Sequence, residues 1–120
     1  MLFDTTQLAL ERSISGASQR QEALAANIAN ATTPGYQRVD VDFHGALSAA
    51  MGSADARGAI EHTGFTTQAD RSVGPVRADG STIDIDAESS KLAANALDQQ
   101  AAVAVARTRN AILRSAMGVA

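Results

Sequence analysis

Residues 24–36, Leu-Ala-Ala-Asn-Ile-Ala-Asn-Ala-Thr-Thr-Pro-Gly-Tyr, join the end of an amphipathic helix to a tight turn. Pro34 fixes its own φ at about −65°, and Gly35 supplies the positive φ that a type II turn needs at its third position. Thr33 precedes the proline and is therefore pushed away from helical backbone angles. The stretch predicts a helix that ends at about Ala31 and a turn at residues 33–36.

The chain before this turn has the pattern of one long helix, running from about Thr5 to Ala31. Apolar and small residues recur there at alternating intervals of four and three, which is a heptad pattern. A heptad stripe indicates packing against a second helix. The large apolar residues of this predicted seam are Leu10, Ile14, Leu24 and Ile28.

A second heptad pattern follows Asp86, which is the predicted N-cap of a helix that continues to the end of the chain. Its predicted seam contains Leu92, Val103, Leu113 and Met117. A second apolar stripe lies beside this seam and predicts a packing partner beyond the N-terminal helix. The second stripe consists of Leu97, Ala101, Val105, Thr108 and Ile112.

The segment between the two helices carries shorter and more varied signals. Residues 39–43 alternate apolar and polar side chains and predict a short, half-buried strand. Residues 46–51 predict a brief helical turn, and the Gly, Ser, Ala and Asp stretch at 52–58 predicts a loop. Further strands are expected near Phe65 and Val76, with a turn at Asp79-Gly80.

The predicted fold class is therefore mainly α. Long N- and C-terminal helices form a coiled-coil-like pair, with a small β/loop region between them. The predicted divisions are an N-terminal helix at 1–31, the turn with the central β/loop region at 32–85, and a C-terminal helix at 86–120.

Composition restricts the possible stabilising features. The chain has no Cys, no Trp and only 3% aromatic residues, so it lacks disulfides, Cys-type zinc sites and most of the side chains that anchor a core. A 120-residue chain with so thin a core gains stability from assembly. No apolar run approaches the ~20 residues that span a bilayer. The N-terminus has neither the basic region nor the apolar region of a cleavable signal peptide.

Charge is distributed unevenly along the chain. Residues 37–90 carry four basic and nine acidic side chains, whereas residues 91–120 carry four basic and one acidic. This asymmetry suits contacts between copies of the chain, and it equally suits a normally solvated surface. No nucleic acid partner is predicted, because the basic residues form no broad patch and have no aromatic neighbours.

Two groups of residues, one of carboxylates with a histidine and one of carboxylates alone, are conceivable metal sites. Carboxylate and histidine ligands would suit a metal ion, but alternation on a solvated strand face produces the same pattern, and that interpretation is favoured. The groups are Asp40, Asp42 and His44, and Asp84, Asp86 and Glu88. No Gly-rich phosphate loop and no Gly-x-Ser-x-Gly motif occurs. We therefore expect no enzyme activity, no cofactor and no metal.

Asn-Ile-Ala-Asn at 27–30 followed by Thr-Pro-Gly-Tyr at 33–36 resembles the N-terminal signature of the flagellar rod, hook and hook-filament junction proteins. Ala26 stands where that signature has an additional Asn. The chain is most similar to the B-type proximal rod subunit, with the C-type rod subunit as the alternative. The segments that carry this closer resemblance are 20–24, 79–86, 92–97 and 112–117.

The resemblance implies a structural subunit that the flagellar type III apparatus exports and that polymerises helically into the periplasmic rod. Its implied partners are copies of itself, other rod subunits, the rod adaptor, and the basal-body ring and export-gate proteins. The implied assembly motif is Asn27, Ile28, Asn30, Thr33, Pro34, Gly35 and Tyr36. The heptad patterns by themselves also fit a free-standing helical adaptor or chaperone.

Overall fold

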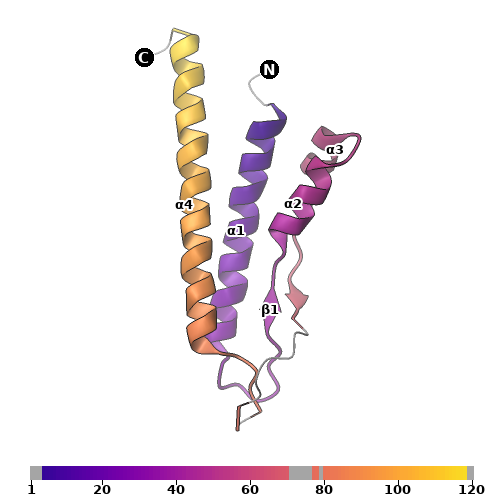
Figure 1. Ribbon diagram of the computed structural model, residues 1–120, viewed down its shortest axis with the longest axis vertical. Helices are drawn as coiled ribbons and strands as arrows, with labels where there is room; N and C mark the ends of the chain where they lie inside the picture. The colour runs from indigo at the N-terminus through magenta and orange to yellow at the C-terminus, as the bar shows by residue number, and fades with distance from the viewer. Residues whose placement is uncertain (1–3, 71–76, 79, 119–120) are drawn as a thin grey trace.

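The computed structural model describes residues 4–70, 77–78 and 80–118. Its elements in chain order are α1 (Thr5–Ala29), β1 (Val39–Asp40), α2 (Phe43–Met51), α3 (Ala56–His62), β2 (Gln68–Ala69) and α4 (Ile85–Ala116). α1 and α4 run antiparallel along the 63 Å axis, so α1 begins at the end of the molecule where α4 finishes (Figure 1). The prediction of a mainly α fold with two long helices and a small β region is confirmed.

α1 is the central element. It packs against α4 on one side and against α2, α3 and β1 on the other (Figure 1). Among the elements described, α4 packs mainly on α1, and only side chains such as His44 of α2 reach it from elsewhere. The position of α4 therefore depends mainly on what it meets along α1.

The apolar core lies on the side of α1 that faces α2, α3 and β1. One cluster consists of Ala9, Leu47, Ala50 and Ile60, and the other of Ala17, Ala23, Val41 and Phe43. Neither cluster includes a residue of α4. Because most of these side chains are small, the buried apolar area is modest.

An aspartate caps the N-terminus of each of the four helices described. The carboxylates of Asp4, Asp42, Asp55 and Asp84 accept hydrogen bonds from backbone N–H groups of the first turn, which otherwise lack partners. The prediction of Asp86 as the cap of α4 is wrong by two residues. Asp84 has the extended backbone of an N-cap and accepts from the amides of Asp86 and Ala87.

The strand predicted at residues 39–43 is shorter than expected. β1 ends at Asp40 and pairs antiparallel with β2, with Val39 opposite Ala69 and Asp40 opposite Gln68. Asp42 caps α2, so Phe43 begins a helix and its side chain packs into the core.

Two other predictions for the middle region are corrected. Phe65 is not in a strand. It precedes β2, and its ring meets that of Phe43 edge-on with 6.2 Å between centroids. The predicted loop at 52–58 is interrupted by α3, because Asp55 caps a helix at Ala56.

The turn before α4 is only partly described. The Gly80 amide donates to the Arg77 carbonyl, and Gly80 has a φ of +80°. The predicted strand near Val76, and Asp79 of the predicted turn, lie outside the described residues.

Gly16 allows the close approach of α1 and α2. A Cβ at this position would lie 2.5 Å from the Cβ of Phe43. We expect Gly16→Ala to lower the free energy of unfolding by about 1–3 kcal/mol, despite the better helix propensity of alanine, because the helices must separate. Urea unfolding measures the change. Gly64→Ala is the control, since a Cβ added there would meet no atom within 4 Å, and equal effects of the two substitutions would contradict the packing argument.

Candidate assembly site

The turn that follows α1 has the predicted backbone. Asn30 is the C-cap of α1, and the Tyr36 amide donates to the Thr33 carbonyl across the turn at 3.3 Å. Gly35 has a φ of +73°, which confirms the predicted positive φ at the third position. Pro34 and Gly35 are exposed, whereas Tyr36 is half-buried.

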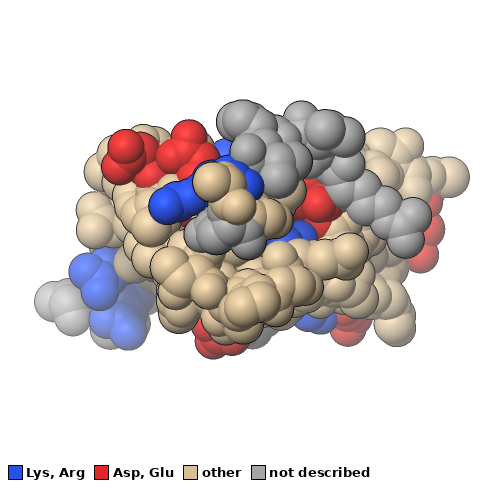
Figure 2. Space-filling model, turned by 90° about the horizontal axis from the view of Figure 1, so that it is seen from below, with Lys and Arg blue, Asp and Glu red and all other residues tan. Residues whose placement is uncertain are grey.

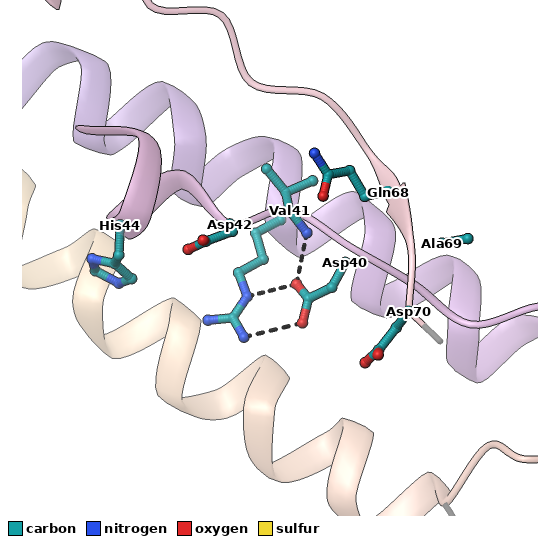
Figure 3. A pocket seen from close by; sticks show the side chains of 8 residues that line it. Asp40, Val41, Asp42, His44, Gln68, Ala69 and Asp70 are labelled. Carbon is teal, nitrogen blue, oxygen red and sulfur yellow. Dashed lines mark hydrogen bonds and ion pairs between the residues drawn. The ribbon is translucent and has the colours of Figure 1, made fainter. Parts of the chain in front are cut away.

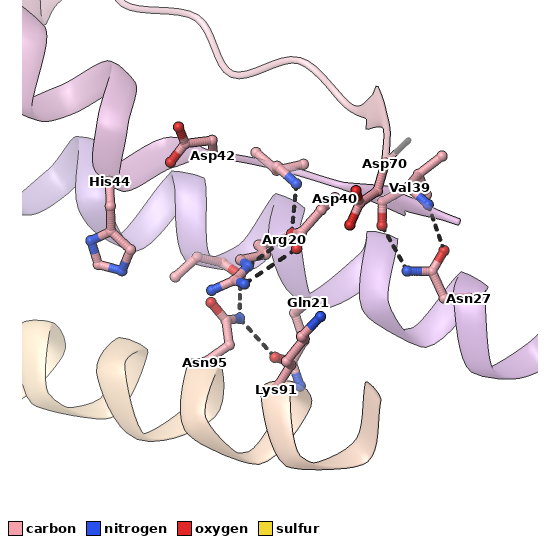
Figure 4. Close-up of polar contacts among 12 residues, drawn as sticks. Arg20, Gln21, Asn27, Val39, Asp40, Asp42, His44, Asp70, Lys91 and Asn95 are labelled. Atoms are coloured by element: carbon pink, nitrogen blue, oxygen red, sulfur yellow. Dashed lines mark hydrogen bonds and ion pairs between the residues drawn. The ribbon is translucent and has the colours of Figure 1, made fainter. Parts of the chain in front are cut away.

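Asn27 fastens the end of α1 to the strand beyond the turn. Its side chain is fully buried. Its Nδ2 donates to the Val39 carbonyl at 2.6 Å, and its Oδ1 accepts from the Val39 amide at 2.9 Å (Figure 4). The side-chain amide thus occupies both backbone groups of Val39, as a neighbouring strand would.

The same side chain also reaches α4. Asn27 Nδ2 donates to Oε2 of Glu88 at 3.0 Å, and the Tyr36 hydroxyl donates to Asn27 Oδ1 at 3.4 Å. Asn27 therefore joins α1, the turn, β1 and the first turns of α4. Of the predicted motif residues, Asn27 and Tyr36 meet directly, while Ile28 is half-buried and Thr33 exposed.

Arg38 is the centre of a buried ionic network next to Asn27. Its guanidinium donates to Glu88, to Asp70 and to Asp40, the last at 3.2 Å. Burial by itself would lower the pKa of Arg38, but the hydrogen bonds and negative charges of Glu88 and Asp40 outweigh it and raise the pKa. Arg38 consequently remains charged and ties β1 to both α4 and the segment after β2.

Asp40 lies between two arginines. Arg20 Nε and Nη2 donate to its two carboxylate oxygens at 2.8 and 3.3 Å (Figure 4). Arg38 adds a third contact. Burial tends to raise the pKa of Asp40, but the hydrogen bonds from Arg20 and from the Val41 amide outweigh it and hold the pKa below its usual value. The bidentate geometry links the middle of α1 to β1.

A pocket of about 430 Å³ opens beside this ion pair (Figure 3). Its carboxylates already have partners in the chain: Asp40 and Asp70 contact arginines, and Asp42 caps α2. The lining residues are Arg20, Asp40, Val41, Asp42, His44, Gln68, Ala69 and Asp70.

The two acidic groups that could have formed metal sites do not converge. Asp42 caps α2, and His44 lies 3.6 Å from Asp98 of α4. Asp84 caps α4, whereas Glu88 points to the buried network on the α1 side. Within the described residues no three potential metal-ligating side chains gather into one site.

The predicted seam residues differ widely in burial. Leu24 is fully buried, whereas Met117, the C-cap of α4, is 55% exposed. The others are half-buried: Leu10, Ile14, Ile28, Leu92, Val103 and Leu113. The second stripe on α4 faces outward, with Leu97, Val105 and Ile112 exposed at 66%, 49% and 61%.

Comparison with known proteins identifies the family. A family model described as "Flagella basal body rod protein" matches residues 12–37, the larger part of α1 together with the turn. Flagellar basal body rod protein FlgB of Escherichia coli (strain K12) is 40% identical over 98 residues, covering 69% of this chain and 71% of that protein. The FlgB proteins of Proteus mirabilis (strain HI4320) and Salmonella typhimurium (strain LT2) are each 37% identical over 108 residues, covering 78% and 73% of this chain and 79% and 75% of theirs.

The chain belongs to the B-type flagellar basal body rod proteins. The family match includes Asn27 and the whole turn, but it ends just before Arg38. The region that the family model recognises therefore includes Asn27, the residue of α1 that contacts both β1 and α4.

Sequence reasoning missed the ionic network of this rod protein. It treated Asp40 and Glu88 as solvated carboxylates and gave Arg38 no role. The available signal was the spacing of Arg38 and Asp40, which lie two apart and so share one face of a strand. Glu88 could not be paired with Arg38 in advance, because 50 residues separate them.

Asn27→Ala tests the fastening of α1 to β1. We expect it to lower the free energy of unfolding by about 2–3 kcal/mol, since the amide and carbonyl of half-buried Val39 and the buried Glu88 carboxylate lose their side-chain partner. Chemical unfolding followed by circular dichroism measures the loss. Asn110→Ala, at an exposed position of α4, should be close to neutral. Similar losses for both would exclude a special role for Asn27.

Asp40→Asn tests the ion pair through its pH dependence. We expect a loss of about 1–2 kcal/mol at pH 7, because Arg20 and Arg38 lose a charged acceptor. The folded-state pKa of Asp40 lies below its ordinary value, so its stabilisation is complete above about pH 3.9 and disappears as the pH falls through the lower folded value. The difference between wild type and variant should therefore shrink in acid.

Unfolding curves at pH 7 and at pH 3 and below measure this difference. Asp98→Asn, at an exposed position of α4, is the control and should change the free energy of unfolding little at pH 7. A difference between wild type and Asp40→Asn that grows on acidification would contradict the ion-pair argument.

Proposed function

We propose that this chain is a structural subunit of the proximal flagellar rod and assembles helically with copies of itself and with other rod subunits. The observation that carries the proposal is the outward apolar stripe of α4. Leu97, Val105 and Ile112 are 66%, 49% and 61% exposed along one face of a helix that packs mainly on α1. A regular apolar stripe on an exposed helix face is typical of a surface that another helix covers.

The burial of α4 supports the same proposal. This helix has 32 residues, and the two that the chain buries, Glu88 and Asn95, are both polar. Long helices in water obtain most of their stability from packing an apolar face. Within one chain α4 obtains little of that stabilisation, so contacts with neighbouring subunits would supply the rest.

The turn and the network around Asn27 suit a structural role. They hold the helix pair and the β region in one fixed arrangement, and the exposed Thr33, Pro34 and Gly35 remain available to neighbours. We propose this segment, with Asn27 and Tyr36 as its internal support, as the assembly motif. The pocket carboxylates are occupied by arginines or by a helix cap, which favours a non-enzymatic subunit without a cofactor.

Family membership suggests the partners and the location. We propose that the subunit is exported by the flagellar type III apparatus and reaches the rod in the periplasmic space. Its further partners there would be the rod adaptor, the basal-body ring and the export gate. None of the described helices is both long and apolar enough to cross a membrane.

A nucleic acid is not among the proposed partners. On the face that Figure 2 shows, Lys and Arg side chains lie in separate groups among uncharged and acidic residues. Binding to a nucleic acid backbone requires a continuous basic surface.

Ile112→Asp tests whether the outward stripe serves assembly. The side chain is 61% exposed, so the isolated chain should keep its helical content and its free energy of unfolding within about 0.5 kcal/mol. A charge at a subunit interface, by contrast, should abolish rod formation and motility in a strain whose native gene is replaced by one that encodes the variant.

Gln100→Asp is the matched control, because it adds the same charge at an exposed position of α4 outside the stripe. Normal motility of the Ile112→Asp strain would refute a role of this face in assembly. A soluble complex with another protein in place of rod formation would favour the adaptor or chaperone alternative.

A further inference from the structure

α4 is held on α1 by two buried polar side chains. Glu88 is 2% exposed and Asn95 is fully buried. Glu88 accepts from Asn27, while Asn95 Nδ2 donates to the backbone carbonyl of Ala17 and to Oε1 of Gln21, each at 2.8 Å (Figure 4). Glu88 and Asn95 are seven residues apart, so they lie on one face of α4 two turns from each other.

The apolar contacts between these helices do not define their register well. Because the stripes repeat every seven residues, sliding α4 by one heptad, about 10 Å, keeps the same faces of the two helices in contact. Leu92 is followed at this interval by Gln99, Ala106 and Leu113, and Leu10 on α1 is followed by Ala17 and Leu24. The small and polar members of these stripes provide few large apolar side chains that could select one alignment.

The polar contacts distinguish these alignments. A slide in one direction would place the Glu88 carboxylate beside the Ala17 carbonyl, where two acceptors meet without a hydrogen. A slide in the other direction would place neutral Asn95 beside Arg38, which would lose its carboxylate partner on α4. Each misaligned state leaves a buried polar or charged group without a suitable partner, which costs on the order of 1–3 kcal/mol or more.

Asn95 itself lowers the stability of the helix pair relative to an apolar residue. Its Oδ1 is buried and has no hydrogen-bond partner among the described residues. An apolar residue at this position would avoid that cost, and a buried Asn between helices is known to fix register at the expense of stability. Specificity rather than stability therefore explains a buried amide at this position.

We propose that Asn95, together with Glu88, sets the register of α4 on α1. The register in turn fixes the axial positions of the exposed Leu97, Val105 and Ile112. Sliding by one heptad would keep these residues on the outward face but displace them by about 10 Å. The inference concerns pairing within one chain, so it stands or falls separately from the proposed rod function.

Distance measurements between spin labels test the proposal. The chain has no Cys, so labels can be attached to Thr6→Cys and Ser89→Cys, two exposed positions near opposite ends of the helix pair. Because the two labels are separated mainly along the helix axis, sliding α4 changes the distance between them by nearly the full length of the slide. The test variant combines Gln21→Leu and Asn95→Leu with Glu88→Gln, so that neither buried polar contact of α4 opposes a slide, and Glu88→Gln alone is measured beside it. The distances are measured by pulsed electron paramagnetic resonance with excess unlabelled chain to exclude intermolecular distances.

We expect one narrow distance in the wild-type background and, in the leucine variant, a second population displaced by about 10 Å. The thermal midpoint of this variant should not fall below that of Glu88→Gln alone, because two leucines bury apolar area in place of a polar pair. Asn110→Leu makes the same change at an exposed position and should keep a single distance.

A single, unshifted distance in the leucine variant would overturn the proposal, and so would a lower thermal midpoint with an unshifted distance, which would make Asn95 a stabilising residue only. Gln21→Ala and Asn95→Ala together with Glu88→Gln provide a second variant if the larger side chains prevent folding. The same second population is expected from it, and its absence would equally overturn the proposal.

Discussion

The pairing of the Asn27 side chain with both backbone groups of Val39 is the interaction on which the rest of the structure depends. It closes the chain across the Thr-Pro-Gly-Tyr turn and fixes the direction in which β1 leaves α1. β1 pairs with β2 at the same residue, and Asn27 also donates to Glu88 at the start of α4. A buried amide without these partners would be costly, so the three segments are stable only in one mutual arrangement.

The two sides of α1 are stabilised by different physical interactions. The side facing α2, α3 and β1 buries apolar side chains such as Leu47, Ile60 and Phe43, and their contribution depends on area rather than direction. The side facing α4 is anchored by Glu88 and Asn95, whose hydrogen bonds require a particular geometry. In a B-type rod protein this division combines a packed inner unit with a long helix that is held by directional contacts and whose outer apolar face is exposed.

Many carboxylates of the acidic middle region, residues 37–90, already have partners within the chain. Arg38 contacts Glu88, Asp70 and Asp40, and Arg20 adds a bidentate contact to Asp40. Asp42, Asp55 and Asp84 serve as helix caps. Fewer carboxylates are therefore available for contacts between copies than the charge distribution along the sequence suggested, and the apolar stripe of α4 becomes the stronger candidate for such contacts.

The sequence by itself determined the features that depend on local sterics and periodicity: the two long helices, the end of α1 before Pro34, the positive φ of Gly35, and the signature that marks the family. It did not determine which of Asp84 and Asp86 caps α4, because both carboxylates have a suitable neighbourhood along the chain. β1 is shorter than expected because Asp42 caps α2 and starts a helix at Phe43. Phe43 can pack against α1 because Gly16 has no side chain there. Only the tertiary structure decided that Arg38 meets Glu88 and that Asn95 meets the Ala17 carbonyl, 50 and 78 residues away along the chain. A hydrogen bond between such distant residues depends on the packing that brings them together and leaves no periodic trace in the sequence.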